Sequence, residues 1–366
     1  MKKIGIITYH RAMNYGAVLQ AFALEKFIKA NFDLNVEIVD YRTSTIESKY
    51  QLPKIKNIHG LIRYPYYFAN FIINILKYYK IKKFVNSQLT LSKQYTSLNF
   101  NDVKNDFDII VVGSDQVWNT EINNYDRMYY LDFNFNMKTS YAASIGKSQL
   151  TSKQKDHIVR TLESFKYLSV REKSSKLLLE DILQRRDIHV NIDPVFLVDA
   201  SIWRKMIRSK ISNRYILVYQ ITHQDNLYNF AKKLSVETGL KLIYLPNSLK
   251  DISVFKSVYN LSPTQFIDYI YNAEYVITNS FHGTAFSIIF NKKFIVEMPK
   301  NNETQNRIID LLELFKLSNR ILDSSTEIFD IVNQNSECSK IDSIIKNEQL
   351  TTLNYFKEIL FQVDKL

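Results

Sequence analysis

Short apolar runs alternate with amphipathic stretches from the first residues of the chain. This alternation predicts an α/β protein built on open, largely parallel sheets. Helices are predicted between the strands, for example at residues 17–30, 152–165 and 226–238. The predicted strands cover residues 4–8, 36–39, 108–112, 139–143, 167–170 and 189–192, followed by 215–220, 241–245, 275–278 and 294–297.

The predicted strands fall into two series, and residues 199–212, which include Trp203, are interpreted as the connection between them. Two doubly wound halves are therefore expected rather than one large sheet. The length agrees, because 366 residues exceed one ordinary core. We expect a Rossmann-like domain at residues 1–205, a second at 206–340, and a helix at 341–366 that packs back on the first domain.

One segment departs from this alternation. Residues 58–86 form a basic and aromatic insertion in the first predicted domain. Its longest uncharged run, residues 64–76, is well short of the roughly 20 residues that a membrane-spanning helix needs. Two interpretations remain open, a helix in peripheral contact with an anionic membrane surface and a buried helical hairpin. The basic residues toward the ends of the insertion are Arg63, Lys77, Lys80, Lys82 and Lys83.

Composition places the chain among folded proteins, with 46% hydrophobic and 23% charged residues. The single cysteine, Cys338, excludes an intramolecular disulfide and indicates a reducing compartment. The start of the chain lacks the apolar core of a signal peptide, so a cytoplasmic protein is expected. The net charge of +11 accompanies a general richness in Lys, Asn, Ile and Tyr, without a compact basic block. No nucleic-acid partner is therefore expected.

Glycine is scarce, with seven in the chain, so the positions of the glycines are informative. Gly16, Gly113, Gly146 and Gly283 each follow a predicted strand and lie before or near a helix. Strand ends that lead into helices are where α/β sheets bind ligands. Tight turns would explain any one of these glycines, but four at such edges favour ligand-binding loops.

The polar neighbours of these glycines support the same interpretation. Carboxylates and hydroxyls can position a sugar, an indole can stack on its apolar face, and arginines bind carboxylate or phosphate. Singly, each residue also has a structural explanation, as a helix cap, an ion pair or core. The polar residues near strand ends are His10, Arg11, Asn14, Ser114, Asp115, Gln116, Trp118, Arg171, Glu172, Asn279, Ser280 and His282, and Arg307 follows further along the chain.

Several common catalytic and cofactor motifs do not occur in the sequence. There is no GxGxxG, P-loop, HExxH, CxxC or GxSxG pattern. Nicotinamide, ATPase, zinc and serine-hydrolase chemistry thus lose their main sequence support, and neither a metal nor a cofactor is expected.

A series of motifs in this order resembles the polysaccharide pyruvyltransferase family. The resemblance covers about residues 3 to 315, and the number and order of the matches make it specific. The motifs are YHRAMNYGAVLQAFAL at residues 9–24, VVGSDQVWN at 111–119, SYAASIGK at 140–147, SVREKSS at 169–175, IDPVFLV at 192–198 and TNSFHGTAFSIIF at 278–290.

The resemblance implies two Rossmann-like domains that face a cleft, similar to GT-B glycosyltransferases. It also implies an enzyme that takes the pyruvyl unit of phosphoenolpyruvate and leaves it as a cyclic ketal on a sugar. The acceptor is then a glycan or a lipid-linked glycan, with the enzyme in the cytoplasm or at the inner face of the membrane.

That reaction needs an acid near C3 of the enol, a group that holds an acceptor hydroxyl, and cations for carboxylate and phosphate. The resemblance makes His282 the candidate acid, since imidazole exchanges protons near neutral pH. Asp115 is the candidate to hold the acceptor hydroxyl. The candidates on the donor side are Arg171, Arg307, Lys300, Asn279, Ser280 and Gly283. All of these except Arg171 lie in the second domain. On the acceptor side, in the first domain, the candidates are Asn14, Tyr15, Gly16, Ser114, Gln116 and Trp118.

The sequence departs from the family pattern at one position. Many members have an arginine two residues before the histidine of the HG loop, where this chain has Ser280. Arg171, Arg307, Lys300 or Arg11 is then expected to supply the missing positive charge for the donor, unless the donor differs.

Two other functions compete with pyruvyl transfer. One is a glycosyltransferase that uses a nucleotide-sugar, because one fold supports several chemistries. The second half lacks the pair of glutamates eight residues apart that many retaining GT-B enzymes have, although inverting enzymes also lack it. The other is a non-catalytic protein that binds carbohydrate or takes part in assembly.

Overall fold

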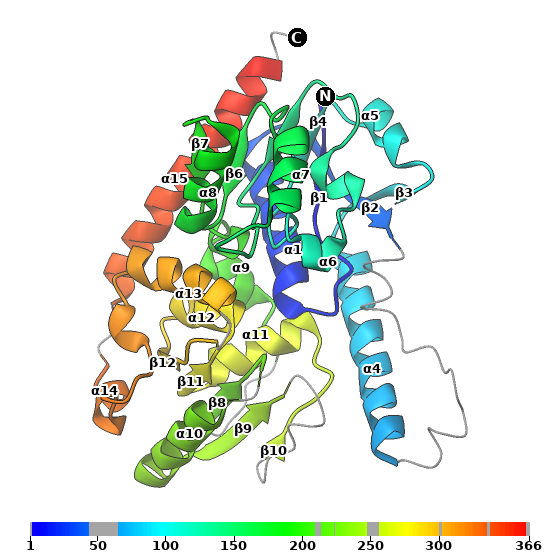
Figure 1. The fold of residues 1–366 in the computed structure, drawn as a ribbon. Coiled ribbons are helices and arrows are strands. Elements are labelled where there is room, and N and C mark those ends of the chain that lie inside the picture. Colours follow the sequence, from blue (N-terminus) through cyan, green and yellow to red (C-terminus); the bar gives the residue numbers. More distant parts are fainter. Residues whose placement is uncertain are drawn as a thin grey trace.

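The computed structural model describes residues 2–43, 65–208, 214–222, 224–246, 256–299, 302–334 and 337–363. Two five-stranded sheets form its framework, one above the other in Figure 1. Their strand orders are β3-β2-β1-β4-β5 and β10-β9-β8-β11-β12. In each sheet the chain starts in the middle, winds to one edge and then to the other, which is the Rossmann-like, doubly wound topology.

All strand pairs in these sheets are parallel. Most inner strands are short runs of apolar residues buried on both faces, such as the sequence IIVV in β4, as a parallel sheet between helices requires. The strands of the first sheet are β1 (Lys3–Ile7), β2 (Asn35–Arg42), β3 (Leu91–Thr96), β4 (Ile109–Val112) and β5 (Lys138–Ser140). Those of the second are β8 (Tyr215–Tyr219), β9 (Lys241–Leu245), β10 (Lys256–Ser257), β11 (Tyr275–Thr278) and β12 (Lys293–Val296).

Two further strands, β6 (Leu168–Val170) and β7 (Ile188–Val190), extend the first sheet beyond β5. Single parallel bridges join them to it, between Thr139 and Tyr167 and between Ala143 and Val170. The ends of β4, β6 and β7 therefore lie along one edge of the first half.

Helices cover the faces of both sheets (Figure 1). The longer helices are α1 (Tyr15–Asn31), α4 (Pro65–Gln88), α7 (Ser152–Leu162), α8 (Lys173–Leu183), α10 (Asp225–Thr238), α11 (Pro263–Asn272), α12 (Phe281–Ile289), α13 (Asn302–Leu314) and α15 (Cys338–Val363). Shorter ones are α5 (Val103–Asp106), α6 (Thr120–Asn123), α9 (Ala200–Lys205) and α14 (Ile328–Val332), with 3-10 turns η1 (Phe100–Asp102), η2 (Arg127–Tyr130), η3 (Pro194–Phe196) and η5 (Ser318–Arg320).

The contact between the two halves is a continuous hydrophobic core. Trp203, on the connection, is fully buried and packs between Phe22 of α1 and Phe286 of α12, with ring centroids 5.6 and 5.1 Å away. Tyr15 of α1 stacks on Phe266 of α11 at 5.0 Å. These aromatic side chains belong to one cluster, which fixes the positions of the two halves relative to each other.

Helix α15 crosses back from the second half to the first and runs along the side of both (red in Figure 1). Its Tyr355 donates a hydrogen bond to the carbonyl of Ser140 at 2.7 Å, and its Thr352 shares one with the hydroxyl of Tyr141 at 2.9 Å. Phe356 stacks on Tyr141 with ring centroids 5.4 Å apart. The last helix therefore completes the core around β5.

The α/β prediction and all ten predicted strands are confirmed. Strands β3 and β10 were not predicted, because β3 (LSKQYT) is a largely polar edge strand and β10 has two residues. The described part of the insertion is the single helix α4 and not a hairpin, and residues 58–64 lie outside the described ranges. Among the described helices, none is long and apolar enough to cross a membrane.

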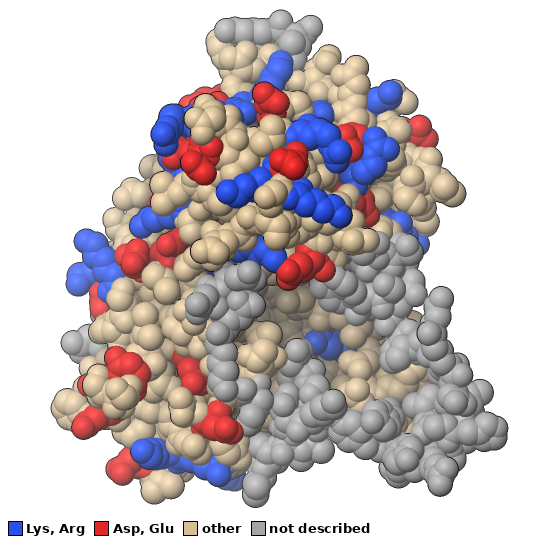
Figure 2. Space-filling model, viewed as in Figure 1, with Lys and Arg blue, Asp and Glu red and all other residues tan. Residues whose placement is uncertain are grey.

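Charged side chains of both signs are interspersed over the upper half of the molecule, which contains the first sheet (Figure 2). Opposite charges pair within the first half, for example Arg127 with Asp132 at 3.0 Å and Arg185 with Asp187 at 2.6 Å. The excess positive charge is therefore not gathered into one field over this part of the face.

Candidate active site

Three strand ends of the first half bring charged side chains together. Asp115 follows β4, Arg171 follows β6 and Asp193 lies shortly after β7. Parallel bridges link Asp115 to Ala143 and Ala143 to Val170, so these loops are neighbours. Asp115 has a φ of 80°, a conformation that a residue with a side chain seldom adopts outside tight turns and functional loops.

Arg171 is the buried centre of this group. Its Nη1 donates to Oδ2 of Asp193 at 2.6 Å and its Nε to Oε1 of Glu172 at 3.4 Å, while Nη2 lies 3.7 Å from Oδ1 of Asp115. Burial alone would lower the pKa of Arg171, but the three carboxylates outweigh it and raise that pKa above its usual range. Arg171 is thus ion-paired within the protein and holds the strand ends together.

The second half contributes His282 through the loop between β11 and α12. Ser280 is the N-cap of α12, where its Oγ accepts a hydrogen bond from the N–H of Gly283 at 3.2 Å. His282 therefore lies in the first turn of the helix and is not its cap. Its ring packs against Gly16 at the start of α1, so closely that a Cβ at residue 16 would overlap the imidazole. Glycine at this position allows the two halves to meet at His282.

Asp193 connects His282 to the charged group of the first half. Its Oδ2 faces Nε2 of His282 at 3.6 Å. That Nε2 is buried and has no hydrogen-bond partner within the described ranges. Burial alone would raise the pKa of Asp193, but its interactions with His282 and Arg171 lower it to about 2. Asp193 is therefore ionised at neutral pH, and a carboxylate so placed can orient an imidazole for proton transfer.

Arg307 of α13 approaches this group from the second half. Its guanidinium lies 5.9 Å from the centroid of the Phe281 ring, over which Arg171 also lies at 4.7 Å. The Nε of Arg307 is buried and lacks a hydrogen-bond partner among the described residues. Burial and the neighbouring charge of Arg171 lower the pKa of Arg307 to about 10. An anionic ligand would relieve both the unsatisfied donor and the repulsion between the arginines.

A cavity of about 230 Å³ lies beside Arg307. Both halves line it, through side chains near α8 and β7 on one side and through Phe281 and α13 on the other. Its charged lining residues are Arg171, Lys173, Asp193, Arg307, Asp310 and Glu348. The cavity thus offers both signs of charge next to the Asp193–His282 pair.

Of the predicted acceptor residues in the first loop, Asn14 is exposed and Tyr15 is buried. Asn14 is exposed, and its Oδ1 caps α1 by accepting from the N–H groups of Gly16 at 2.9 Å and Ala17 at 3.3 Å. Tyr15 is buried in its stack with Phe266. Asn14 therefore faces solvent beside Gly16, whereas Tyr15 belongs to the contact between the halves.

The loop after β4 turns two of its predicted acceptor residues into the core. Ser114 is fully buried and donates to the carbonyl of Ala142 at 2.7 Å. Trp118 is also fully buried, with its Nε1 donating to the carbonyl of Tyr129 at 3.0 Å. The expectation that Trp118 stacks on a sugar does not fit this position, because its faces are covered by core side chains. Gln116 keeps partial exposure.

The predicted donor residues around β11 serve mainly to hold the loops. Asn279 accepts from the N–H of Ile221 at 2.8 Å, and its Nδ2 donates to Oε1 of Gln224 at 2.6 Å. Ser280 caps α12, so no cation stands at this place. Lys300 lies outside the described residues. Of the predicted donor cations in the described ranges, Arg171 and Arg307 each keep a buried nitrogen without a hydrogen-bond partner, Nη2 and Nε respectively, but Arg171 is already paired with carboxylates.

Asp193 was not among the predicted site residues. It follows a predicted strand and belongs to the IDPVFLV motif, so the criterion that selected Asp115 and Arg171 would have found it. Its other oxygen, Oδ1, accepts from the N–H of Val195 at 3.1 Å, which fixes the carboxylate at the start of η3.

Together these residues can move a proton through the Asp193–His282 pair and bind an anion at Arg307. The carboxylates of Asp115, Glu172 and Asp193 each form an ion pair with Arg171. Across the described ranges, no group of three or more His, Cys, Asp or Glu side chains could hold a metal ion.

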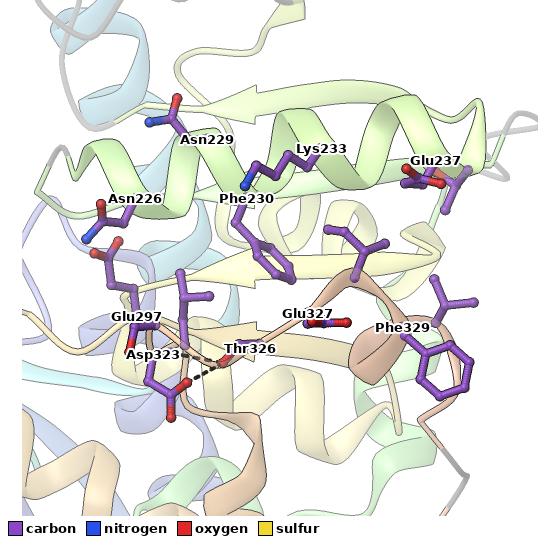
Figure 3. Close-up of a pocket in the computed structure, with 15 residues that line it drawn as sticks. Asn226, Asn229, Phe230, Lys233, Glu237, Glu297, Asp323, Thr326, Glu327 and Phe329 are labelled. Carbon is purple, nitrogen blue, oxygen red and sulfur yellow. Dashed lines mark hydrogen bonds between the residues drawn. The ribbon is translucent and has the colours of Figure 1, made fainter.

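A larger cavity of about 1070 Å³ lies elsewhere, in the second half between α10 and α14 (Figure 3). None of the predicted site residues lines it. Its charged lining is acidic, with Glu237, Glu297, Asp323 and Glu327 against Lys233. Asp323 also accepts a hydrogen bond from Thr326 at 3.0 Å, drawn in Figure 3. An acidic cavity disfavours an anionic donor, so we place the candidate site at the junction of the halves.

Solved structures support the fold. A protein of Listeria monocytogenes assigned as a UDP-N-acetylglucosamine 2-epimerase matches with a TM-score of 0.54 at 10% identity, covering 94% of this chain and 91% of that chain. The UDP-GlcNAc 2-epimerase of Neisseria meningitidis, bound to UDP-GlcNAc, matches with a TM-score of 0.51 at 9% identity, covering 99% and 100%. At these identities the likeness shows the fold alone, two Rossmann-like halves arranged as in GT-B proteins.

No curated protein gives a significant match to the sequence. The family comparison, in contrast, is extensive. The family model described as polysaccharide pyruvyl transferase matches residues 14–299. This range includes the Asn14–Gly16 loop, Asp115, Arg171, Asp193 and His282, although Arg307 lies beyond it. The chain therefore belongs to the polysaccharide pyruvyl transferase family.

Proposed function

We propose that the protein transfers the pyruvyl group of phosphoenolpyruvate to a sugar of a polysaccharide or of its lipid-linked precursor. The product is a cyclic pyruvate ketal, and phosphate is released. Membership of the family supports a transferase. The observation that carries the proposal is the buried Asp193–His282 pair next to the unsatisfied Arg307, where the two halves meet.

The proposed reaction makes two C–O bonds and breaks one. Two hydroxyls of the acceptor add to C2 of the enol, and the bond between C2 and the phosphate oxygen breaks. Of the two protons that the hydroxyls lose, one goes to C3, which becomes a methyl group, and the other leaves with the phosphate. In the proposal, His282 gives the proton to C3. In this arrangement Asp193 faces Nε2 of His282. The other ring nitrogen, Nδ1, lies on the side of Gly16 and exchanges the proton.

Arg307 is the proposed binding residue for the carboxylate or phosphate of the donor. Arg171 shares the cavity, but its charge is balanced by three carboxylates, so it is proposed to position Asp193. Arg307 thereby takes over the positive charge that Ser280 does not provide. Lys300 stays a further proposed donor residue.

We further propose that the acceptor binds along the strand ends of the first half. Asn14, Gln116 and Asp115 have polar groups on partly exposed loops there, and Asp115 would accept a hydrogen bond from an acceptor hydroxyl. In this proposal residues 1–205 form the acceptor side and residues 206–340 most of the donor side. A lipid-linked acceptor would bring the enzyme to the inner face of the membrane.

A donor comparison tests the function. The purified protein, incubated with phosphoenolpyruvate, is expected to release phosphate once a suitable glycan acceptor is added. Mass spectrometry of the acceptor is expected to show a gain of one pyruvate less water. Turnover with nucleotide-sugars, and none with phosphoenolpyruvate, would instead establish a glycosyltransferase. Binding of glycan without turnover on any donor would establish a carbohydrate-binding protein.

Replacing Arg307 with methionine is expected to raise the KM for phosphoenolpyruvate about ten- to a hundredfold, with a smaller change in the KM for the acceptor. A charge-assisted hydrogen bond to a ligand typically stabilises the complex by about 1.5–3 kcal/mol, which corresponds to this range. The matched control is Arg320→Met, which removes another buried arginine with an unsatisfied Nε from outside the cavity. Equal donor KM values for wild type and Arg307→Met would remove Arg307 from the donor site.

A further inference from the structure

Helix α4 contacts the protein along one side. Ile81 and Phe84 are buried, and the Phe84 ring lies 6.0 Å from Phe22 of α1. Lys80 donates to Oδ1 of Asn260 at 3.2 Å, near the start of α11. These contacts attach the C-terminal part of α4 to both halves of the molecule.

The opposite side of α4 is apolar and exposed. Phe68, Ile72, Leu76 and Tyr79 are 52, 38, 44 and 57% exposed. Their spacings of four, four and three residues place them along one face, which we call the α4 stripe. Lys83, four residues after Tyr79, continues the same face and is exposed. Exposed apolar residues scattered singly are ordinary, but a row of four on one helix marks an interaction surface.

The sequence around the α4 stripe contains no negative charge. From residue 48 to residue 101 the charged residues are all Lys or Arg. The face of the upper half drawn in Figure 2 differs, since acidic and basic side chains are mixed there. The exposed side of α4 therefore combines apolar side chains with the positive charges of Lys82 and Lys83.

We propose that the α4 stripe docks on an anionic lipid bilayer. The four apolar side chains would enter the boundary between headgroups and acyl chains, while Lys82 and Lys83 contact the lipid phosphates. A second copy of the chain is a poorer occupant. A two-fold contact between α4 stripes would bring the lysines of both copies together with no acidic residue of this region to balance them.

Helix α4 reaches the candidate active site through its attached side, opposite the α4 stripe. Nζ of Lys77 lies 4.7 Å from the centroid of the Tyr15 ring, and Tyr15 precedes the glycine that packs against His282. A protein docked through α4 thus holds its acceptor loop close to the helix that contacts the bilayer. The use of this arrangement for a lipid-linked acceptor rests on the proposed function, whereas the docking itself does not.

Vesicle co-sedimentation of the full chain tests the docking. Binding is expected to vesicles of phosphatidylglycerol and phosphatidylcholine and to be at least about tenfold weaker to phosphatidylcholine alone. The triple variant Ile72→Ser, Leu76→Ser, Tyr79→Ser is expected to bind the anionic vesicles at least about tenfold more weakly than wild type. The same loss is expected for Lys82→Glu with Lys83→Glu.

Matched controls use exposed residues on other elements. Leu177→Ser, Val236→Ser and Phe329→Ser together remove as many exposed apolar side chains, and Lys155→Glu with Lys166→Glu changes the charge equally. Both controls are expected to bind anionic vesicles within about twofold of wild type.

Three results would overturn the docking proposal. These are wild-type vesicle binding by the α4 triple variant, equal binding of wild type to neutral and anionic vesicles, and a lipid-free dimer that the triple variant abolishes in sedimentation velocity. Phosphate release with a soluble acceptor, measured on the same variants, is expected to match wild type. Vesicle binding therefore tests the docking, and phosphate release tests pyruvyl transfer independently of it.

Discussion

Replacing His282 with alanine is expected to lower kcat for pyruvyl transfer by about a hundred- to ten-thousandfold while the protein stays folded. The reason is that proton transfer to C3 would lose its positioned acid, which typically contributes this much to a rate. The fold is expected to persist because α12 keeps its cap at Ser280 and the first turn loses no backbone hydrogen bond. The measurement is phosphate release at saturating phosphoenolpyruvate and acceptor, together with the thermal unfolding temperature.

A second histidine provides the control. His189 packs near Tyr355 at a ring distance of 5.0 Å, on the side of the first half that α15 covers. His189→Ala is expected to keep kcat within about twofold of wild type. Near wild-type turnover by His282→Ala would show that another group protonates C3.

The largest effect in the first half is expected at Asp193. Asp193→Asn keeps the shape of the side chain but removes the negative charge between Arg171 and His282. We expect kcat to fall by about a hundredfold or more, because the imidazole loses the carboxylate that orients it, with a smaller change in the KM for phosphoenolpyruvate. Steady-state kinetics that separate kcat from KM provide the readout.

Loss of a buried ion pair also affects stability, by about 3–5 kcal/mol when one partner is left unpaired. Glu172→Gln is the matched control, because Glu172 is buried and pairs with Arg171 but is not the carboxylate that faces His282. If both variants lose stability and kcat to the same extent, Asp193 is a structural residue. A loss of kcat confined to Asp193→Asn, at comparable unfolding temperatures, would assign it to the positioning of His282.

The fold was predictable because parallel strands covered by helices are nearly continuous apolar runs. The five residues of β8, YILVY, are all buried, and their pattern differs sharply from the amphipathic helices around them. Edge strand β3 has water on much of its surface, so its sequence LSKQYT carries no such signal. The helix in the insertion was harder to assign, because it is apolar both on the side that packs on the protein and on the exposed side, so its sequence lacks a clear amphipathic pattern.

For the candidate site, the sequence indicated the loops but not the directions of their side chains. Scarce glycines after strands located the loops of Gly16 and Gly283. Whether a polar residue on such a loop faces a cavity or the core depends on neighbours distant in sequence. Trp118 is covered by the core, and Arg171 is neutralised by three carboxylates, while Arg307 keeps a free Nε. These differences arise from tertiary contacts.

Helix α15 also constrains the order in which the chain can fold during synthesis. Ser140 and Tyr355 are hydrogen-bonded but lie 215 residues apart, so the first half leaves the ribosome long before the helix that covers Tyr141. Until then the apolar surface around β5 has no cover and is open to chaperones or to aggregation. The core around β5 can therefore close only after the chain has been translated through residue 356.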